Sequence, residues 1–183
     1  MPAPPAASAA SEIKRMQLYS SKSPSAPLSH EVYESLASLG HASPSTAAEL
    51  PVEDVARFTC LNYTGSAGAR SAASFLGLSP IVSCLDLGSG LGGPAIVFSS
   101  ATGCEVTGVE LQPDQAAVAK QLARACGVGN RVTFVAGDFL TVPPPRRHGA
   151  LFSALVVLHV PLARRAALFA RARASLEPGA RVA

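Results

Sequence analysis

The stretch that decides the fold is LDLGSGLGGP, residues 85–94. An apolar run that starts at Ile81 leads into it, and glycines occupy positions 88, 90, 92 and 93. Glycine permits positive φ angles and lets the backbone approach a ligand closely, while proline suits the first turn of a helix. The pattern therefore predicts a buried strand, a tight turn, and a helix whose amino end faces a bound group.

Short apolar segments alternate with helix-like segments from this turn to the end of the chain. We expect strands over residues 81–87, 105–110, 131–135 and 151–158, with a fifth starting near 179. We expect helices over residues 94–102, 113–127 and 162–176, and two more upstream, one starting at 51 and one over 68–76. Such an alternation predicts a doubly wound, Rossmann-like α/β fold: a mostly parallel sheet with helices on both faces.

The last predicted helix repeats large apolar residues every seven positions, at Leu162, Phe169 and Leu176. Residues spaced in this way share one side of a helix. We therefore expect these three side chains to face the core. Arg164 and Arg171 fall on the opposite side and are expected to face solvent.

The first 50 residues differ in composition from the rest of the chain. They are rich in alanine, proline and serine, and Pro24, Pro27 and Pro44 divide them into short pieces. We expect a disordered tail and a loose N-terminal cap over residues 1–50. The Rossmann-like domain is expected over residues 51–183.

Composition excludes several classes of protein. The chain is 48% hydrophobic and 15% charged, which is enough apolar material for a core. Its longest strongly apolar run covers residues 150–160, well short of the roughly 20 residues that span a bilayer. No transmembrane helix is therefore predicted.

The net charge of +3 arises entirely after residue 140, where seven arginines accompany a single acid. A basic end can bind nucleic acid. Phe169 is the only aromatic residue interleaved with these arginines, however, so bases would find few stacking partners. A solvated helix face is favoured over nucleic-acid binding.

The four cysteines, Cys60, Cys84, Cys104 and Cys126, include no CxxC pair, so no metal site is predicted. Free cysteines in apolar stretches favour a reducing, cytoplasmic location. The N-terminus has no apolar segment typical of a secretory signal. An organellar location is the alternative, if the Ala/Pro/Ser-rich segment is a transit peptide.

An acid follows the glycine turn at the distance that nucleoside binding requires. The turn fits both GxGxG and GxGxxG, so the glycines alone do not identify the ligand. Glu110 ends the second predicted strand, 20 residues after Gly90. A carboxylate at this place can accept hydrogen bonds from both hydroxyls of a ribose.

Asp86 distinguishes between two candidate nucleoside ligands. It lies in an otherwise apolar strand two residues before the first glycine, so its charge needs a cation or hydrogen bonds as compensation. It would repel the pyrophosphate of a dinucleotide, but it would attract the cationic amino acid portion and sulfonium of S-adenosylmethionine. An alternative role for Asp86, capping backbone amides of the turn, is compatible with both ligands.

A third acid, Asp138, follows the third predicted strand within Gly137-Asp138-Phe139. An acid there can accept a hydrogen bond from the exocyclic amine of an adenine, while Phe139 lies against the ring. A Gly-Asp pair alone is a common turn. Acids at three successive strand ends are a stronger sign of a nucleoside site.

These motifs closely resemble those of the class I S-adenosylmethionine-dependent methyltransferases, over about residues 62–183. The first motif is LDLGSGLGGPA, residues 85–95, and the ribose and adenine motifs are residues 109–111 and 137–139. The form GSGLGGPA and the segment LHVP, residues 158–161, are most similar to the small-molecule branch, which includes sarcosine and dimethylglycine, phosphoethanolamine and sterol methyltransferases. The resemblance implies a set of cofactor-binding residues: Tyr63, Asp86, Gly88, Ser89, Gly90, Gly92, Glu110, Leu111, Asp138 and Phe139.

Two features depart from the family pattern. Gly149 stands where most members have an aspartate that opens the fourth strand. The family sheet has seven strands, whereas this chain ends as the fifth begins, so we expect a fold that lacks its last strands. The sequence identifies neither the acceptor nor the oligomeric state.

The predicted reaction is methyl transfer to a small-molecule acceptor, which depends mainly on positioning. His159, after the fourth predicted strand, is the expected catalytic residue, since an imidazole can orient the acceptor or remove its proton near neutral pH. A purely structural role for His159 stays open. Two functional alternatives also remain: a nicotinamide-dependent oxidoreductase, and a truncated module that binds a nucleoside without turnover.

Overall fold

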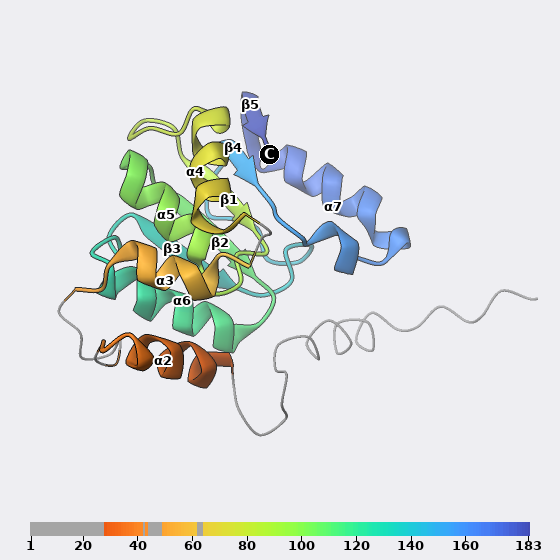
Figure 1. Cartoon of the computed structure of the whole chain (residues 1–183). Helices are drawn as coiled ribbons and strands as arrows, with labels where there is room; N and C mark the ends of the chain where they lie inside the picture. The colour runs from red at the N-terminus through yellow and green to blue at the C-terminus, as the bar shows by residue number, and fades with distance from the viewer. Residues whose placement is uncertain (1–27, 42, 44–48, 62–63) are drawn as a thin grey trace, which may run out of the picture.

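The computed structural model describes residues 28–41, 43, 49–61 and 64–183. Their strands form one parallel sheet of five, in the order β3-β2-β1-β4-β5 (Figure 1). The strands are β1 (Cys84–Leu87), β2 (Val106–Glu110), β3 (Val132–Ala136), β4 (His148–Phe152) and β5 (Leu176–Val182). The order reverses between β1 and β4, as in a doubly wound sheet. The predicted Rossmann-like α/β fold is confirmed.

The helices cover the two faces of the sheet unequally. They are α2 (Leu28–Ser38), α3 (Val52–Thr59), α4 (Gly65–Leu76), α5 (Gly93–Thr102), α6 (Pro113–Ala125), the short 3-10 helix η2 (Val157–His159) and α7 (Leu162–Ala174). Helices α2 to α6 bury their apolar side chains in one large core, whereas α7 packs on a smaller core across the sheet (Figure 1).

Helix α5 follows the glycine turn as the sequence predicts. Pro94 lies in its first turn, where a missing N–H costs nothing. Gly103 ends it at φ +72°, a left-handed conformation that glycine adopts without strain. Because β1 enters the turn and α5 leaves it, the turn is held between a buried strand and a helix with seven buried residues.

Part of the expected N-terminal cap packs more tightly than a loose cap would. Helix α2 places Val32 and Leu36 in the large core, at 4% and 0% exposure. The Tyr33 hydroxyl donates a hydrogen bond of 2.5 Å to the Gln121 side chain of α6. Burial of these apolar side chains thus packs α2 on the large core.

The fourth strand lies earlier than the sequence suggests. The prediction of residues 151–158 is wrong, because β4 ends at Phe152. Leu155 then adopts a left-handed backbone with φ +59°, and η2 follows. The long apolar run suggested a longer strand, but Val156 and Val157 are apolar because they pack on the smaller core from outside the sheet.

The predicted orientation of α7 is also wrong. Its one buried residue is Leu168, while Leu162 and Phe169 are 80% and 56% exposed. The side of the helix that faces the sheet carries Arg164 and Arg171, and both have partners there. Specific contacts of these arginines thus outweigh the seven-residue apolar repeat.

The fifth strand starts three residues before the predicted position, at Leu176. Among the described strands it pairs with β4 alone, with a register shift between His148 and Ala150. Pro178 is tolerated there because an edge strand has one unpaired side. None of the helices in the described part of the chain is long and apolar enough to cross a membrane.

A histidine is buried in the large-core face of β4. His148 has no exposed surface, and neither ring nitrogen hydrogen-bonds to any described residue. The pKa of His148 is lowered to about 4, mainly by burial and also by the Arg146 guanidinium, against an opposing effect of Glu105. The folded protein therefore holds this imidazole in its neutral form.

We predict that replacing His148 with leucine, which fills a similar volume, removes an acid-sensitive part of stability. The folded-state pKa lies below the unfolded value near 6.5, so the unfolded chain binds the proton first as the pH falls. Relative to His148→Leu, the wild type should lose up to about 1.4 kcal/mol of unfolding free energy per pH unit between pH 6.5 and 4. Urea unfolding of both proteins at pH 7 and pH 5 measures this. If the difference in unfolding free energy between the two proteins is the same at pH 7 and at pH 5, the prediction is contradicted.

Candidate functional site

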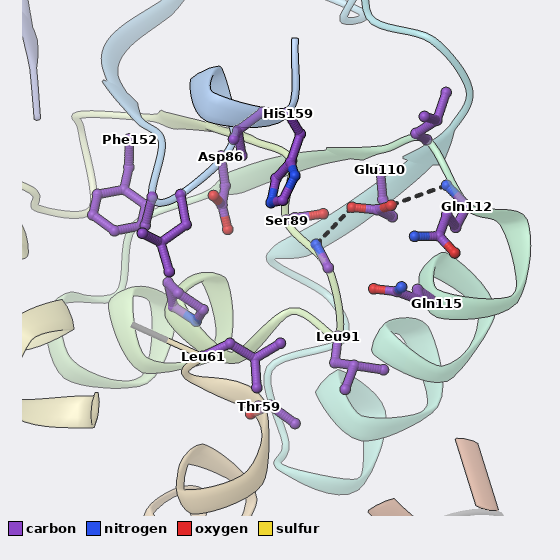
Figure 2. Close-up of a pocket in the computed structure, with 17 residues that line it drawn as sticks. Thr59, Leu61, Asp86, Ser89, Leu91, Glu110, Gln112, Gln115, Phe152 and His159 are labelled. Carbon is purple, nitrogen blue, oxygen red and sulfur yellow. Dashed lines mark hydrogen bonds between the residues drawn. The ribbon is translucent and has the colours of Figure 1, made fainter. Parts of the chain in front are cut away.

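A cavity of about 290 Å³ opens at the carboxyl ends of β1, β2 and β4 (Figure 2). Its walls are the glycine turn, the start of α6, the loop after β4 and the end of α3. The cavity lies where the strand order reverses, which is the usual ligand position in this architecture. Its polar side chains are Thr59, Asp86, Ser89, Glu110, Gln112, Gln115 and His159.

The glycine turn admits no larger residues at its critical positions. Gly88 has φ +72°, and a Cβ there would lie 2.3 Å from Cγ2 of Val156. A Cβ on Gly93 would lie 2.4 Å from the carbonyl carbon of Thr59. The turn is therefore fixed between the loop after β4 and the end of α3.

The predicted turn residues divide into two groups. Gly88, Ser89 and Gly90 line the cavity, and cofactor binding by them stays a prediction. Gly92 is buried with φ +79° and donates its N–H to the Ser89 carbonyl, but it does not line the cavity. Its contribution is to the shape of the turn.

Asp86 is a buried acid in the cavity wall. It is 2% exposed, and its Oδ2 hydrogen-bonds to no described residue. The pKa of Asp86 is raised to about 7, first by burial and second by the nearby Glu110 carboxylate. The Ser89 hydroxyl, also buried in this wall, has no described partner either. The cavity thus contains two desolvated oxygens that no described residue compensates.

Glu110 holds the glycine turn in place. Its Oε2 accepts the Gly90 N–H at 2.8 Å, and its Oε1 accepts the Gln112 N–H at 2.9 Å (Figure 2). Burial raises the pKa of Glu110, while these backbone hydrogen bonds lower it. Glu110 thus caps the turn, the alternative role that the sequence left open for Asp86. Each carboxylate oxygen keeps further acceptor capacity toward the cavity.

The third predicted acid lies outside the cavity wall. Asp138 Oδ2 accepts a hydrogen bond from the Arg164 guanidinium at 2.5 Å, and Oδ1 accepts the Leu140 N–H at 2.9 Å. Phe139 is buried, and the Arg171 guanidinium lies 5.9 Å from its ring centroid. In this structure both residues anchor α7, so an adenine contact by Asp138 would require its oxygens to be shared or exchanged.

The remaining predicted site residues are Leu111, His159 and Tyr63. Leu111 and His159 line the cavity, His159 from the end of η2 (Figure 2). Tyr63 lies outside the described residues. The structure therefore groups Asp86, Glu110 and His159 at one cavity and separates Asp138 from them.

The family described as Methyltransferase domain matches residues 84–179, about half of the chain. The chain belongs to this family. The matched span begins at β1 and ends within β5, so it includes the glycine turn and every predicted acid of the site.

Curated relatives of this methyltransferase domain match over part of its length. A sterol 24-C-methyltransferase of Gibberella zeae is 31% identical over 105 residues, which is 57% of this chain and 27% of the relative. Squalene methyltransferase 1 of Botryococcus braunii is 37% identical over 71 residues, 39% of this chain and 19% of the relative. The chain spans about a quarter of the length of the curated relatives it matches.

Solved structures share the fold of this methyltransferase domain. The glycopeptide N-methyltransferase MtfA is 28% identical with a TM-score of 0.56, covering 62% of this chain and 50% of MtfA. A Thiobacillus denitrificans methyltransferase bound to S-adenosyl-L-homocysteine is 25% identical with a TM-score of 0.57, covering 72% and 53%. The [4+2]-cyclase SpnF is also similar, at 25% identity and a TM-score of 0.58 over 63% and 42%. The fold alone therefore does not decide the reaction.

Sequence reasoning missed several residues of the cavity. Gln115 lies in the first turn of α6 and lines the cavity with 8% exposure. Leu61, Phe152 and Leu155 provide apolar wall. The position of Gln115, five residues after Glu110 at a helix start, was a usable signal. The left-handed conformation of Leu155 had no such signal in the sequence.

We predict that Asp86→Asn stabilises the ligand-free protein at pH 8. The folded-state pKa of about 7 lies above the unfolded value near 3.8, so the unfolded chain releases this proton first as the pH rises. Stability is therefore lost between about pH 4 and pH 7 and stays low at pH 8. Asparagine removes that charge, and we expect a gain of about 1–3 kcal/mol at pH 8 that shrinks toward pH 4. Urea unfolding across this range measures the gain.

Asp114→Asn is the matched control for this prediction. Asp114 lies exposed in the first turn of α6, so its charge is already solvated. It should show no comparable gain at pH 8. A destabilised Asp86→Asn at pH 8 would refute the assignment of an uncompensated buried charge.

Proposed function

We propose that this chain binds S-adenosylmethionine and transfers its methyl group to a small-molecule acceptor. The observation that carries the proposal is the buried, unpartnered carboxylate oxygen of Asp86 beside a glycine turn. A desolvated carboxylate favours a cationic ligand, which would replace the compensation that the protein omits. When bound, the cofactor supplies a methyl carbon activated by a sulfonium.

The residues present fit this cofactor. Asp86 offers a negative charge and Ser89 a hydroxyl to a charged, polar group. Glu110, fixed by the Gly90 and Gln112 amides, presents acceptor capacity suited to ribose hydroxyls. The adenine contact predicted for Asp138 and Phe139 stays a prediction, because both contact α7 arginines.

The part of the cavity wall that would contact the methyl acceptor is apolar, which favours an apolar small molecule as the acceptor. Leu61, Phe152 and Leu155 line it, and His159 lies at its polar edge. The names of the curated relatives, sterol and squalene methyltransferases, agree with an apolar acceptor. In this proposal His159 orients the acceptor or takes its proton, while the apolar wall excludes water.

The competing functions have less support. The matched family is a methyltransferase domain, which does not favour a nicotinamide-dependent oxidoreductase. A module that binds the nucleoside without turnover would share the same cavity, and only an activity assay separates it from an enzyme. We further propose a reducing, cytoplasmic location, which agrees with the four free cysteines.

Calorimetric titration with S-adenosylhomocysteine tests the cofactor assignment. We expect the wild type to bind and Asp86→Ala to lose at least tenfold in affinity, whereas Asp114→Ala retains it. Because the pKa of Asp86 is about 7, wild-type affinity should fall about tenfold from pH 8 to pH 6 as the carboxylate is protonated. Wild-type affinity that is absent, or that is unaffected by Asp86→Ala, would overturn the proposal.

A His159→Ala variant tests the acceptor side. With an acceptor identified from a panel of sterols and other apolar molecules, turnover should fall about 100-fold if His159 moves a proton in the reaction. The affinity for S-adenosylhomocysteine should change little, which separates catalysis from binding. Unchanged turnover would remove His159 from the mechanism.

A further inference from the structure

Helix α7 carries its large apolar side chains on the outside of the molecule. It lies along one flank of the fold, and its one buried residue is Leu168 (Figure 1). Leu162 and Phe169 are on the same side of the helix and are 80% and 56% exposed. The other exposed residues of α7, which the structure describes throughout, are five alanines and Arg173. An exposed apolar face of this kind marks a contact site for another surface.

The exposed apolar residues continue along the chain from α7 back to the cavity. Leu158 in η2 is 59% exposed, and Leu155 is 42% exposed. Leu155 lines the cavity, and so does His159, which follows Leu158. We call residues 155–169 the exposed apolar segment. One of its ends is therefore at the cavity wall, and the other is in the middle of α7.

The charge that accompanies this segment is positive. Residues 139–176 contain six arginines and no acid. Arg146 and Arg164 form ion pairs with acids from outside that range. Arg173 is exposed and follows Phe169 by four residues, which places the two side chains on the same side of α7. The apolar face therefore has a charge that complements an anionic partner.

Two other partners fit this face less well. In a closed two-fold pair of chains the same patch meets itself. Helix α7 carries four arginines and no acid, so a pair formed through it would bring like charges together. A nucleic acid has the complementary charge, but leucine side chains offer its bases no stacking surface. A lipid surface matches both the apolar residues and the charge.

We propose that the exposed face of α7 docks the protein on the surface of a membrane that contains anionic lipids. Leu162 and Phe169 enter the boundary between headgroups and acyl chains, while Arg173 extends its charge to the lipid phosphates. The helix lies in the plane of the membrane and does not span it.

Docking goes beyond the proposed function, because it requires neither the cofactor nor the acceptor. It also has a consequence for the cavity. Since the exposed apolar segment reaches the cavity at Leu155, docking would bring the cavity close to the membrane, in which an apolar acceptor dissolves.

Co-sedimentation with lipid vesicles tests the docking. One set of vesicles is pure phosphatidylcholine, and the other contains about one-third phosphatidylserine. We expect the wild type to bind the anionic vesicles more tightly than the neutral ones. Phe169→Asp and Leu162→Asp should each lower the partition coefficient at least about tenfold. Arg173→Gln should lower it about fivefold on the anionic vesicles and leave it unchanged on the neutral ones.

Phe75→Asp is the matched control. Phe75 is 65% exposed in α4, which packs on the large core across the sheet from α7. This variant should bind vesicles as the wild type does, and thermal unfolding verifies that each variant is folded. Absent wild-type binding, binding unaffected by Phe169→Asp and Leu162→Asp, or an equal loss in Phe75→Asp would overturn the docking.

The same proteins distinguish the other partners. Sedimentation velocity that shows a dimer lost in Phe169→Asp, without vesicle binding, would overturn the docking in favour of a second copy. Oligonucleotide binding that Arg173→Gln abolishes, without vesicle binding, would overturn it in favour of a nucleic acid. Binding of S-adenosylhomocysteine without vesicle binding would overturn the docking alone, whereas vesicle binding without S-adenosylhomocysteine binding would overturn the proposed function alone.

Discussion

The site depends on a buried carboxylate whose charge no residue in the described part of the chain compensates. Asp86 occupies a central strand, 2% exposed, with one oxygen unpartnered. Such a position destabilises the empty protein, so it persists only if the surroundings hold it rigidly. They do so through Glu110, which fixes the glycine turn, and through the close contacts of Gly88 and Gly93 with neighbouring segments. The buried charge that we propose binds the cofactor is therefore also the charge that destabilises the empty protein.

Most of the fold could be predicted because local signals agreed with one another. Apolar strands, the glycine turn, and the Pro94 and Gly103 boundaries of α5 all depend on neighbouring residues. The errors arose where several residues could satisfy one pattern. An apolar run of eleven residues does not reveal that the strand ends at Phe152 and that Leu155 adopts a left-handed backbone. The seven-residue repeat of α7 does not reveal the partners of its arginines.

The site was predicted less completely, for a related reason. Asp86 and Glu110 could be placed because the ends of adjacent parallel strands must lie together. The environment of Asp138 depends on Arg164, which is 26 residues away and on the other side of a crossover. No short motif encodes that ion pair. Gln115 and the apolar wall are likewise defined by which segments converge on the cavity.

The unequal covering of the sheet has a consequence for how the domain opens. Helices α2 to α6 share one large core on one side of the sheet, while α7 lies on the other side with Leu168 as its single buried residue. Regions with little apolar burial open at lower free energy than the rest of a protein. The amide hydrogens of α7 should therefore exchange with deuterated solvent sooner than those of β1 and α5, by a local detachment that leaves the glycine turn intact.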